Sequence, residues 1–200
     1  MTKPIIGILG GGQLGMMLCD AAKEIDIETH VFCPDDDCPS KGRSTYFSIG
    51  EYSDEEKIIK FSNSVDFITY EFENIPIKTI DFIKDQNKIR PGKQSLLLTQ
   101  DRLTEKRFLD KLNIPIAPYK DLKTIDDVIS SQNQFINSIV KTRTLGYDGK
   151  GQFNLRQSDD PNKVFNRIVS KSIIEKRIPF EFEVSVIIGR DINNNTTIFP

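Results

Sequence analysis

The stretch that decides the fold is "IIGILGGGQLGMML", Ile5 to Leu18. Its β-branched start, "IIGIL", is typical of a buried strand and ends in three consecutive glycines. From Gln13 to Glu24 the apolar residues recur at helical spacing, so a helix should follow the glycines directly. The inward face of this helix is predicted to carry Leu14, Met17, Leu18 and Ala21. A strand that runs through a glycine turn into a helix is the first unit of a parallel α/β sheet.

The glycine turn, Gly10 to Gly15, matches the pattern G-x-G-x-x-G. Glycines let the backbone approach a ligand closely, and the N-terminus of the following helix offers N–H groups to a phosphate. Asp35 stands 20 residues after Gly15, where dinucleotide-binding enzymes hold a ribose. The turn therefore fits a phosphate site, a dinucleotide site, or a packing turn that binds nothing.

Strands and helices continue to alternate beyond this first unit, which predicts a parallel sheet covered on both faces. The strands are expected at 27–32 and 65–70, and the helices at 55–62, 77–86 and 96–112. Ser53 or Asp54 can cap the first of these helices, and Ile77, Ile80 and Ile83 should face inward on the second. The first domain is expected to span residues 1–92.

The pattern changes after "NIPIAPYK", whose two prolines end the helical spacing. Residues 93–120 are therefore expected to form a connecting helix and linker, and residues 121–200 a small α+β unit. Its strands are predicted at 137–141, 152–156, 172–176, 183–189 and 196–200, and its helices near 124–131 and 160–168. The asparagines at 193–195 are typical of a hairpin turn.

Composition excludes several classes of function. The formal net charge of the 200 residues is −2, which argues against a surface dedicated to nucleic acid. No apolar run approaches the roughly 20 residues needed to span a membrane. A single histidine and three cysteines without a C-x-x-C pair disfavour a metal site or a histidine-activated nucleophile. We expect a cytoplasmic protein with reduced thiols, no catalytic nucleophile and no metal ligands in this chain.

A charged glycine loop, "KTRTLGYDGKGQ", runs from Lys141 to Gln152 between two predicted strands. Its glycines give mobility, Arg143 and Lys150 give positive charge, and backbone N–H groups in such a turn can cradle phosphate oxygens. The spacing is not that of a Walker loop. The loop is either a solvated hairpin tip or a cover for a bound phosphate group.

Carboxylates mark the ends of two predicted strands. Glu71 and Glu73 follow the strand at 65–70, where they suit an amino group, a cation or the cap of the next helix. Glu175 closes a later strand, and Glu181 and Glu183 should open the next one on a shared face. Such carboxylates can accept hydrogen bonds from ribose hydroxyls, or they can protect an exposed edge strand.

Taken in order, these segments resemble the ATP-grasp superfamily, and within it the family of N5-carboxyaminoimidazole ribonucleotide synthases. The matching segments are "GILGGGQLGMML", "ITYEFENIP", "QDRLTEKRFLDKLNIPIAPY", "IVKTRTLGYDGKGQ", "IIEKRIPFEFEVSV" and "TTIFP". Six segments in the right order make the resemblance specific. It implies an α/β fold with an N-terminal Rossmann-like preATP-grasp domain, followed by a small α+β ATP-grasp lid subdomain.

The resemblance also implies an activity, that of an ATP-dependent ligase of purine (IMP) biosynthesis. In this family ATP activates bicarbonate as carboxyphosphate, and the amine of 5-aminoimidazole ribonucleotide is carboxylated. The implied cofactors are ATP and Mg²⁺, with the metal ligands in a later ATP-grasp part that this chain lacks. The implied partners are these small molecules and, in full-length members, a second subunit, but no nucleic acid or membrane. We expect this truncated length to be inactive alone.

By position, the resemblance assigns a nucleotide site. Arg102, which pattern alone leaves on a solvated helix face, and Lys141 would contact the ATP phosphates. The loop over them would comprise Gly146, Tyr147, Asp148, Gly149, Lys150, Gly151 and Gln152. The adenine edge would be lined by Glu175, Lys176, Arg177 and Ile178, although the basic pair is unusual for this hinge. Glu183 would hold the ribose.

The resemblance assigns the second substrate to the first domain. Gly12, Gln13 and Leu14 would take the phosphate of the ribonucleotide, and Glu73 would lie near its imidazole amine. Two alternatives stay open. The first is an NAD(P)-dependent oxidoreductase that uses the glycine turn and Asp35, although it leaves Lys141 to Gln152 without a role. The second is a nucleotide-binding fragment without catalysis.

Overall fold

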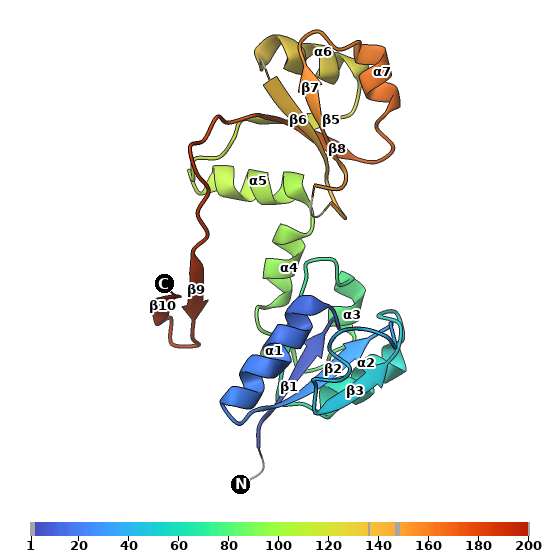
Figure 1. Ribbon diagram of the computed structural model, residues 1–200, viewed down its shortest axis with the longest axis vertical. Coiled ribbons are helices and arrows are strands. Elements are labelled where there is room, and N and C mark those ends of the chain that lie inside the picture. Colours follow the sequence, from blue (N-terminus) through green and yellow to red (C-terminus); the bar gives the residue numbers. More distant parts are fainter. Residues whose placement is uncertain (1–2, 136, 147–148, 200) are drawn as a thin grey trace.

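The computed structural model describes residues 3–135, 137–146 and 149–199. Figure 1 shows an elongated molecule in which two α/β units lie at opposite ends, joined by two consecutive helices. Within the described residues, no helix is long and apolar enough to cross a membrane.

The first unit is built on a parallel sheet. Its strands are β1 (Ile5–Leu9), β2 (Glu28–Cys33), β3 (Tyr46–Ile49) and β4 (Phe67–Tyr70), in the order β3-β2-β1-β4. All three pairings are parallel, which confirms the predicted α/β class. Strand β3 was not predicted, because its four residues follow a long polar loop and leave little room for an alternating pattern.

Helices cover both faces of this sheet, as predicted. Helix α1 (Gln13–Glu24) covers one face, where Cys19 is buried against Ile8 and Val31. Helices α2 (Glu55–Asn63), α3 (Ile77–Asp81) and α4 (Lys93–Thr99) cover the other, around a core that includes Phe61, Ile80 and Leu96. A short 3-10 helix, η1 (Gln86–Lys88), follows α3, which ends earlier than predicted. Asp54 caps α2, as expected, by accepting a hydrogen bond from the Lys57 N–H at 3.1 Å.

The predicted inward face of α1 is wrong. Small residues, Gly15, Cys19 and Ala22, face the sheet, whereas Leu14 and Met17 are 59% and 56% exposed. Gly15 explains this choice, because a Cβ there would lie 2.9 Å from the carbonyl oxygen of Gly10. The helix starts so close to the turn that only its small-residue face fits against the sheet, and the larger apolar side chains are left outside.

The helix predicted at 96–112 is two helices, α4 and α5 (Arg102–Lys111). Asp101 interrupts them with extended backbone, at φ −120°. Its carboxylate accepts hydrogen bonds from the N–H groups of Leu103 and Thr104, at 2.9 and 3.1 Å. An aspartate at this position stabilises the start of a new helix more than it supports continuation of the old one. Helix α4 therefore ends in the first core, and α5 starts in a new direction (Figure 1).

The second unit is an antiparallel sheet with two helices. Its strands are β5 (Tyr119–Leu122), β6 (Asn137–Thr142), β7 (Gln152–Arg156) and β8 (Ser172–Lys176), in the order β5-β8-β6-β7. Helices α6 (Ile125–Gln134) and α7 (Pro161–Asn166) contribute to a core that includes Val128, Val140 and Ile174. Strands β6 and β7 form the predicted hairpin, with Lys141 opposite Gln152. Strand β5 was missed because it follows Pro118 directly within the predicted linker.

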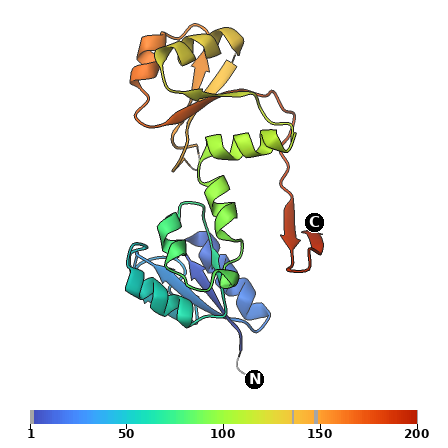
Figure 2. The ribbon, with the colours of Figure 1, turned by 180° about the vertical axis from the view of Figure 1, so that it is seen from behind.

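The last elements form a hairpin of their own, β9 (Ile187–Arg190) and β10 (Thr196–Phe199). Figure 2 shows this hairpin at the end of an extended segment, apart from both sheets. Its turn contains Asn194 at φ +64°, as the asparagine run predicted. Residues 177–186 form no strand, so the expectation that Glu181 and Glu183 open one is wrong.

Candidate functional site

The glycine turn holds a carboxylate from its own chain. Glu71 directly follows β4, and its Oε1 accepts a hydrogen bond from the Gly12 N–H at 2.7 Å. Its Oε2 accepts one from the Gly15 N–H at 2.5 Å. A Cβ added to Gly10, Gly12 or Gly15 would come within 2.4, 2.7 or 2.8 Å of a Glu71 side-chain atom. The three glycines of the pattern therefore make room for this carboxylate.

Two further backbone N–H groups at this turn donate no hydrogen bond within the described residues. In the part of the chain that the structure describes, the backbone N–H groups of Gln13 and Leu14 have no hydrogen-bond partner. Both stand at the N-terminus of α1, where the helix dipole favours an anion. Of the predicted phosphate residues, Gln13 and Leu14 therefore present free donors, whereas the N–H of Gly12 is already used.

The charges of Glu73 and Glu175 both affect the pKa of Glu105, a residue of α5. Burial raises the pKa of Glu105, Lys106 and Arg102 lower it, and the charges of Glu175 and Glu73 raise it further. The net effect is a pKa above the ordinary value. Glu73 comes from the first unit and Glu175 from the second, so charges from both units contribute to the raised pKa of this carboxyl. Sequence patterns gave no sign of Glu105.

Glu175 is a buried carboxylate, only 7% exposed, held between two ammonium groups. Its Oε2 lies 2.8 Å from Nζ of Lys141 on β6, and its Oε1 lies 3.2 Å from Nζ of Lys106 on α5. The Lys106 ammonium group also lies 5.4 Å from the ring centre of Tyr119. Lys106 was not among the predicted site residues. The signal that could have found it is its position four residues after Arg102, on the same face of the helix.

Arg102 fixes the base of the glycine loop. Its guanidinium donates hydrogen bonds to the carbonyl oxygens of Thr142, at 2.9 Å, and Gly146, at 2.6 Å. Beside it, the Arg143 guanidinium donates to both carboxylate oxygens of Asp101, from Nη2 to Oδ2 at 2.7 Å and from Nε to Oδ1 at 3.1 Å. The start of α5 is thereby joined to the end of β6, and loop and helix form one assembly.

The loop turns through residues with left-handed backbone, Gly149 at φ +76° and Gly151 at φ +71°. The N–H of Thr142 donates to the carbonyl oxygen of Gly151 at 2.8 Å, which closes the hairpin beside Gln152. Tyr147 and Asp148, two of the predicted loop residues, lie outside the described residues. Strands β6 and β7 thus pair as a hairpin, as predicted.

The predicted adenine segment lies at the end of β8. The Lys176 N–H donates to the carbonyl oxygen of Pro118 at 2.8 Å, and the Arg177 N–H to that of Asn137 at 2.9 Å. Lys176, Arg177 and Ile178 line a cavity of about 580 Å³. Glu183 is exposed and, among the described residues, takes part in no hydrogen bond or ion pair.

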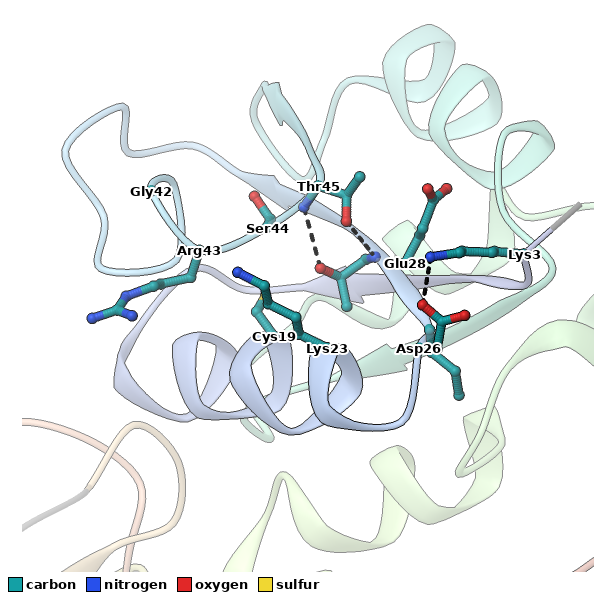
Figure 3. A pocket seen from close by; sticks show the side chains of 11 residues that line it. Lys3, Cys19, Lys23, Asp26, Glu28, Gly42, Arg43, Ser44 and Thr45 are labelled. Carbon is teal, nitrogen blue, oxygen red and sulfur yellow. Dashed lines mark hydrogen bonds and ion pairs between the residues drawn. The ribbon is translucent and has the colours of Figure 1, made fainter.

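Another cavity, of about 350 Å³, lies at the far end of α1 and is lined by none of the predicted site residues (Figure 3). Among its polar groups, Lys3 pairs with Asp26, and Thr29 and Thr45 exchange hydrogen bonds, whereas the Ser44 hydroxyl is buried without a hydrogen-bond partner among the described residues. Across residues 3–135, 137–146 and 149–199, no group of three histidine, cysteine or carboxylate side chains could hold a metal ion.

Comparison with known proteins agrees with this arrangement. The N5-carboxyaminoimidazole ribonucleotide synthase of Staphylococcus aureus is 36% identical over 197 residues, which cover 98% of this chain and 53% of the relative. The structure of the S. aureus synthetase complexed with ADP superposes with a TM-score of 0.91 at 35% identity, covering 100% of this chain and 54% of that one. The Aspergillus clavatus synthase complexed with ATP gives a TM-score of 0.87 at 26% identity, with 99% and 53% covered.

The chain thus spans about half the length of the relatives that it matches. Family models divide it between residue 100, just after α4, and residue 107, within α5. Residues 1–100 match the ribonucleotide synthetase preATP-grasp domain, and residues 107–200 match the ATP-grasp domain. With a parallel sheet that carries the glycine turn and an antiparallel sheet that carries the lysine-paired Glu175, this chain belongs to the ATP-grasp family of ribonucleotide synthetases.

Proposed function

We propose that this chain binds ATP and 5-aminoimidazole ribonucleotide as part of an N5-carboxyaminoimidazole ribonucleotide synthase, an ATP-dependent ligase of purine biosynthesis. The observation that carries the proposal is the pairing of the buried Glu175 carboxylate with the ammonium groups of Lys141 and Lys106. The relatives' names and their complexes with ADP and ATP support the same assignment.

The cations around Glu175 suit phosphoryl transfer, which depends mostly on positioning and charge neutralisation. In the proposal, Lys141 turns from Glu175 to an oxygen of the ATP phosphates. Lys106 keeps the buried Glu175 carboxylate paired while Lys141 is engaged, so that no charge is left alone in the interior. Arg102 holds the loop base, and the hairpin tip closes over the phosphates and excludes water from carboxyphosphate.

The first unit receives the ribonucleotide. Its phosphate accepts hydrogen bonds from the N–H groups of Gln13 and Leu14, and the carboxylate of Glu73 accepts one from the imidazole amine. The proposal extends to bicarbonate as co-substrate, to Mg²⁺ as the ion that accompanies ATP, to a homodimer and to a cytoplasmic location. The described residues do not form a metal site, so none of the steps above is assigned to the metal.

Binding measurements on the 200-residue chain test this function. In calorimetric titrations we expect saturable binding of ADP and, separately, of 5-aminoimidazole ribonucleotide, and in a fluorescence titration no binding of NADH. Lys141→Ala should weaken ADP binding and leave the ribonucleotide unaffected, whereas Glu73→Ala should do the reverse. ADP binding that is insensitive to Lys141→Ala, or saturable NADH binding by the unmodified chain, would overturn the proposal.

A further inference from the structure

The glycine turn has the sequence of a dinucleotide site but a different occupant. In dinucleotide-binding domains the N–H groups at this turn receive the pyrophosphate bridge. Here the N–H groups of Gly12 and Gly15 donate instead to the two carboxylate oxygens of Glu71. An acceptor that uses the same donors competes directly with a bound pyrophosphate.

The sheet holds Glu71 in this position. Its backbone N–H donates to the carbonyl oxygen of Leu9 at 3.2 Å, which continues the pairing of β4 with β1 by one residue. The next residue, Phe72, packs against the core on the other face and so fixes the direction of the chain. The carboxylate is therefore presented to the turn by the main chain of the sheet.

The glycine spacing has its own explanation in this arrangement. The Cβ of any residue at Gly10 would lie 2.4 Å from Cγ of Glu71, and one at Gly12 would lie 2.7 Å from its Oε1. Gly10 has a φ of +114°, so a side chain is also strained there. The same three glycines that admit a pyrophosphate elsewhere are required here by an internal side chain.

We propose that Glu71 is a specificity-determining residue that excludes the diphosphate bridge of a dinucleotide. Its carboxylate occupies the anion cradle at the N-terminus of α1, which is formed by the N–H groups of Gly12 and Gly15. The negative charge satisfies both the free N–H groups and the positive end of the helix dipole without a ligand. Only the Gln13 and Leu14 N–H groups remain for a phosphate monoester. This last point rests on the proposed function; occupation of the cradle by Glu71 does not.

Rescue by a small anion tests the occupation. Glu71→Ala leaves a space of carboxylate size beside two unpaired N–H groups. We expect its melting temperature to rise in acetate and not in the neutral isostere acetamide, at matched ionic strength. The unmodified chain and Glu73→Ala should respond equally to both additives. If Glu71→Ala folds only in the presence of acetate, that outcome also supports a carboxylate in the cradle. Equal melting temperatures of Glu71→Ala in acetate and in acetamide would show that the cradle does not hold the Glu71 carboxylate.

Titration with NADH tests the specificity. Removing a like charge beside the cradle and freeing its donors should make NADH binding by Glu71→Ala detectable, at least about tenfold tighter than the detection limit that the unmodified chain does not reach. Glu71→Gln keeps one acceptor oxygen and is the milder second variant, for which we expect a smaller gain in the same direction. An unchanged NADH affinity in both variants would overturn the specificity role. Neither measurement uses ATP or the ribonucleotide, so failure here leaves the proposed function standing.

Discussion

The carboxylate of Glu175 and the ammonium group of Lys141 meet across two neighbouring strands, β8 and β6, with Oε2 and Nζ 2.8 Å apart. Lys106 reaches the other carboxylate oxygen from α5. A buried carboxylate is costly without a partner, and a second lysine keeps it paired if the first moves to a ligand. This arrangement makes Lys106 a positioning residue for the nucleotide site.

Lys106→Ala should therefore weaken ADP binding about tenfold, because Lys141 must then stay with Glu175 as its only cation. Arg107→Ala is the matched control, since the neighbouring arginine is exposed and pairs with no carboxylate in the described chain. Calorimetric titration with ADP measures both variants. Equal affinities for ADP would show that Lys106 contributes nothing to the site. Lys106→Arg, which keeps the charge, should recover part of the loss.

Strand β1 could be predicted from the sequence, whereas the ion pair of Lys106 with Glu175 could not. The strand Ile5–Leu9 and the hairpin around Lys141 and Gln152 were predictable because their signals are local, in β-branched runs bounded by glycines. The pairing of Lys106 with Glu175 joins residues 69 positions apart and depends on the angle at which α5 crosses the second sheet. No local pattern encodes that angle.

The face of α1 and the break at Asp101 show how local rules compete. Leu14 and Met17 follow helical spacing, but the close approach at Gly15 turns the opposite face toward the sheet. Asp101 lies within a helical pattern, yet its carboxylate caps a new helix and pairs with Arg143. In both cases a tertiary contact decided between two conformations that the sequence allowed.

The Asp101–Arg143 pair should make stability depend on pH. Burial acts to raise the pKa of Asp101, but hydrogen bonds from Arg143, Thr104 and Leu103 outweigh it, so the pKa lies below the ordinary value. A depressed pKa means that the pair stabilises the fold above about pH 4 and that this stabilisation is lost as the pH falls through the folded-state pKa.

Two substitutions at Asp101 separate its roles. Asp101→Asn keeps a good helix cap and loses the ion pair, and should cost about 1 kcal/mol at neutral pH. Asp101→Ala loses both and should cost about 2 kcal/mol. Urea unfolding at pH 7 and pH 3 measures both, and the cost of Asp101→Asn should shrink at pH 3. A cost that is constant with pH would show that the charge of Asp101 is not involved.

Gly151 and Gly149 should differ in their tolerance of alanine, although both have left-handed backbone, at φ +71° and +76°. A Cβ on Gly151 would lie 2.6 Å from Oγ1 of Thr142, whereas one on Gly149 has its nearest neighbour at 3.8 Å. Both variants should lose about 1 kcal/mol from backbone strain, and Gly151→Ala should lose more from the clash.

Thr142→Ala supplies the control for this clash. The Thr142 hydroxyl is buried without a hydrogen-bond partner, so its removal alone should cost little. Combined with Gly151→Ala, it should restore stability to the level of Gly149→Ala in the same urea-unfolding measurement. If the double variant is no more stable than Gly151→Ala, the clash with Thr142 is not the cause.

Neutralising Glu73 should lower the pKa of Glu105. Burial is the largest cause of the raised Glu105 pKa, and the charges of Glu175 and Glu73 add to it. Glu73→Gln removes a negative charge that raises the Glu105 pKa, while the positive charges of Lys106 and Arg102 that lower it remain. The Glu105 carboxyl should therefore ionise at a lower pH. Carbon-13 NMR titration of labelled glutamate side chains measures this pKa, with Glu105→Gln to assign the signal.

Glu181→Gln is the matched control, because Glu181 is exposed in the irregular segment and is not among the charges that act on Glu105. It should leave the Glu105 titration unchanged. A Glu105 pKa that does not respond to Glu73→Gln would show that the charge of Glu73 does not act on Glu105.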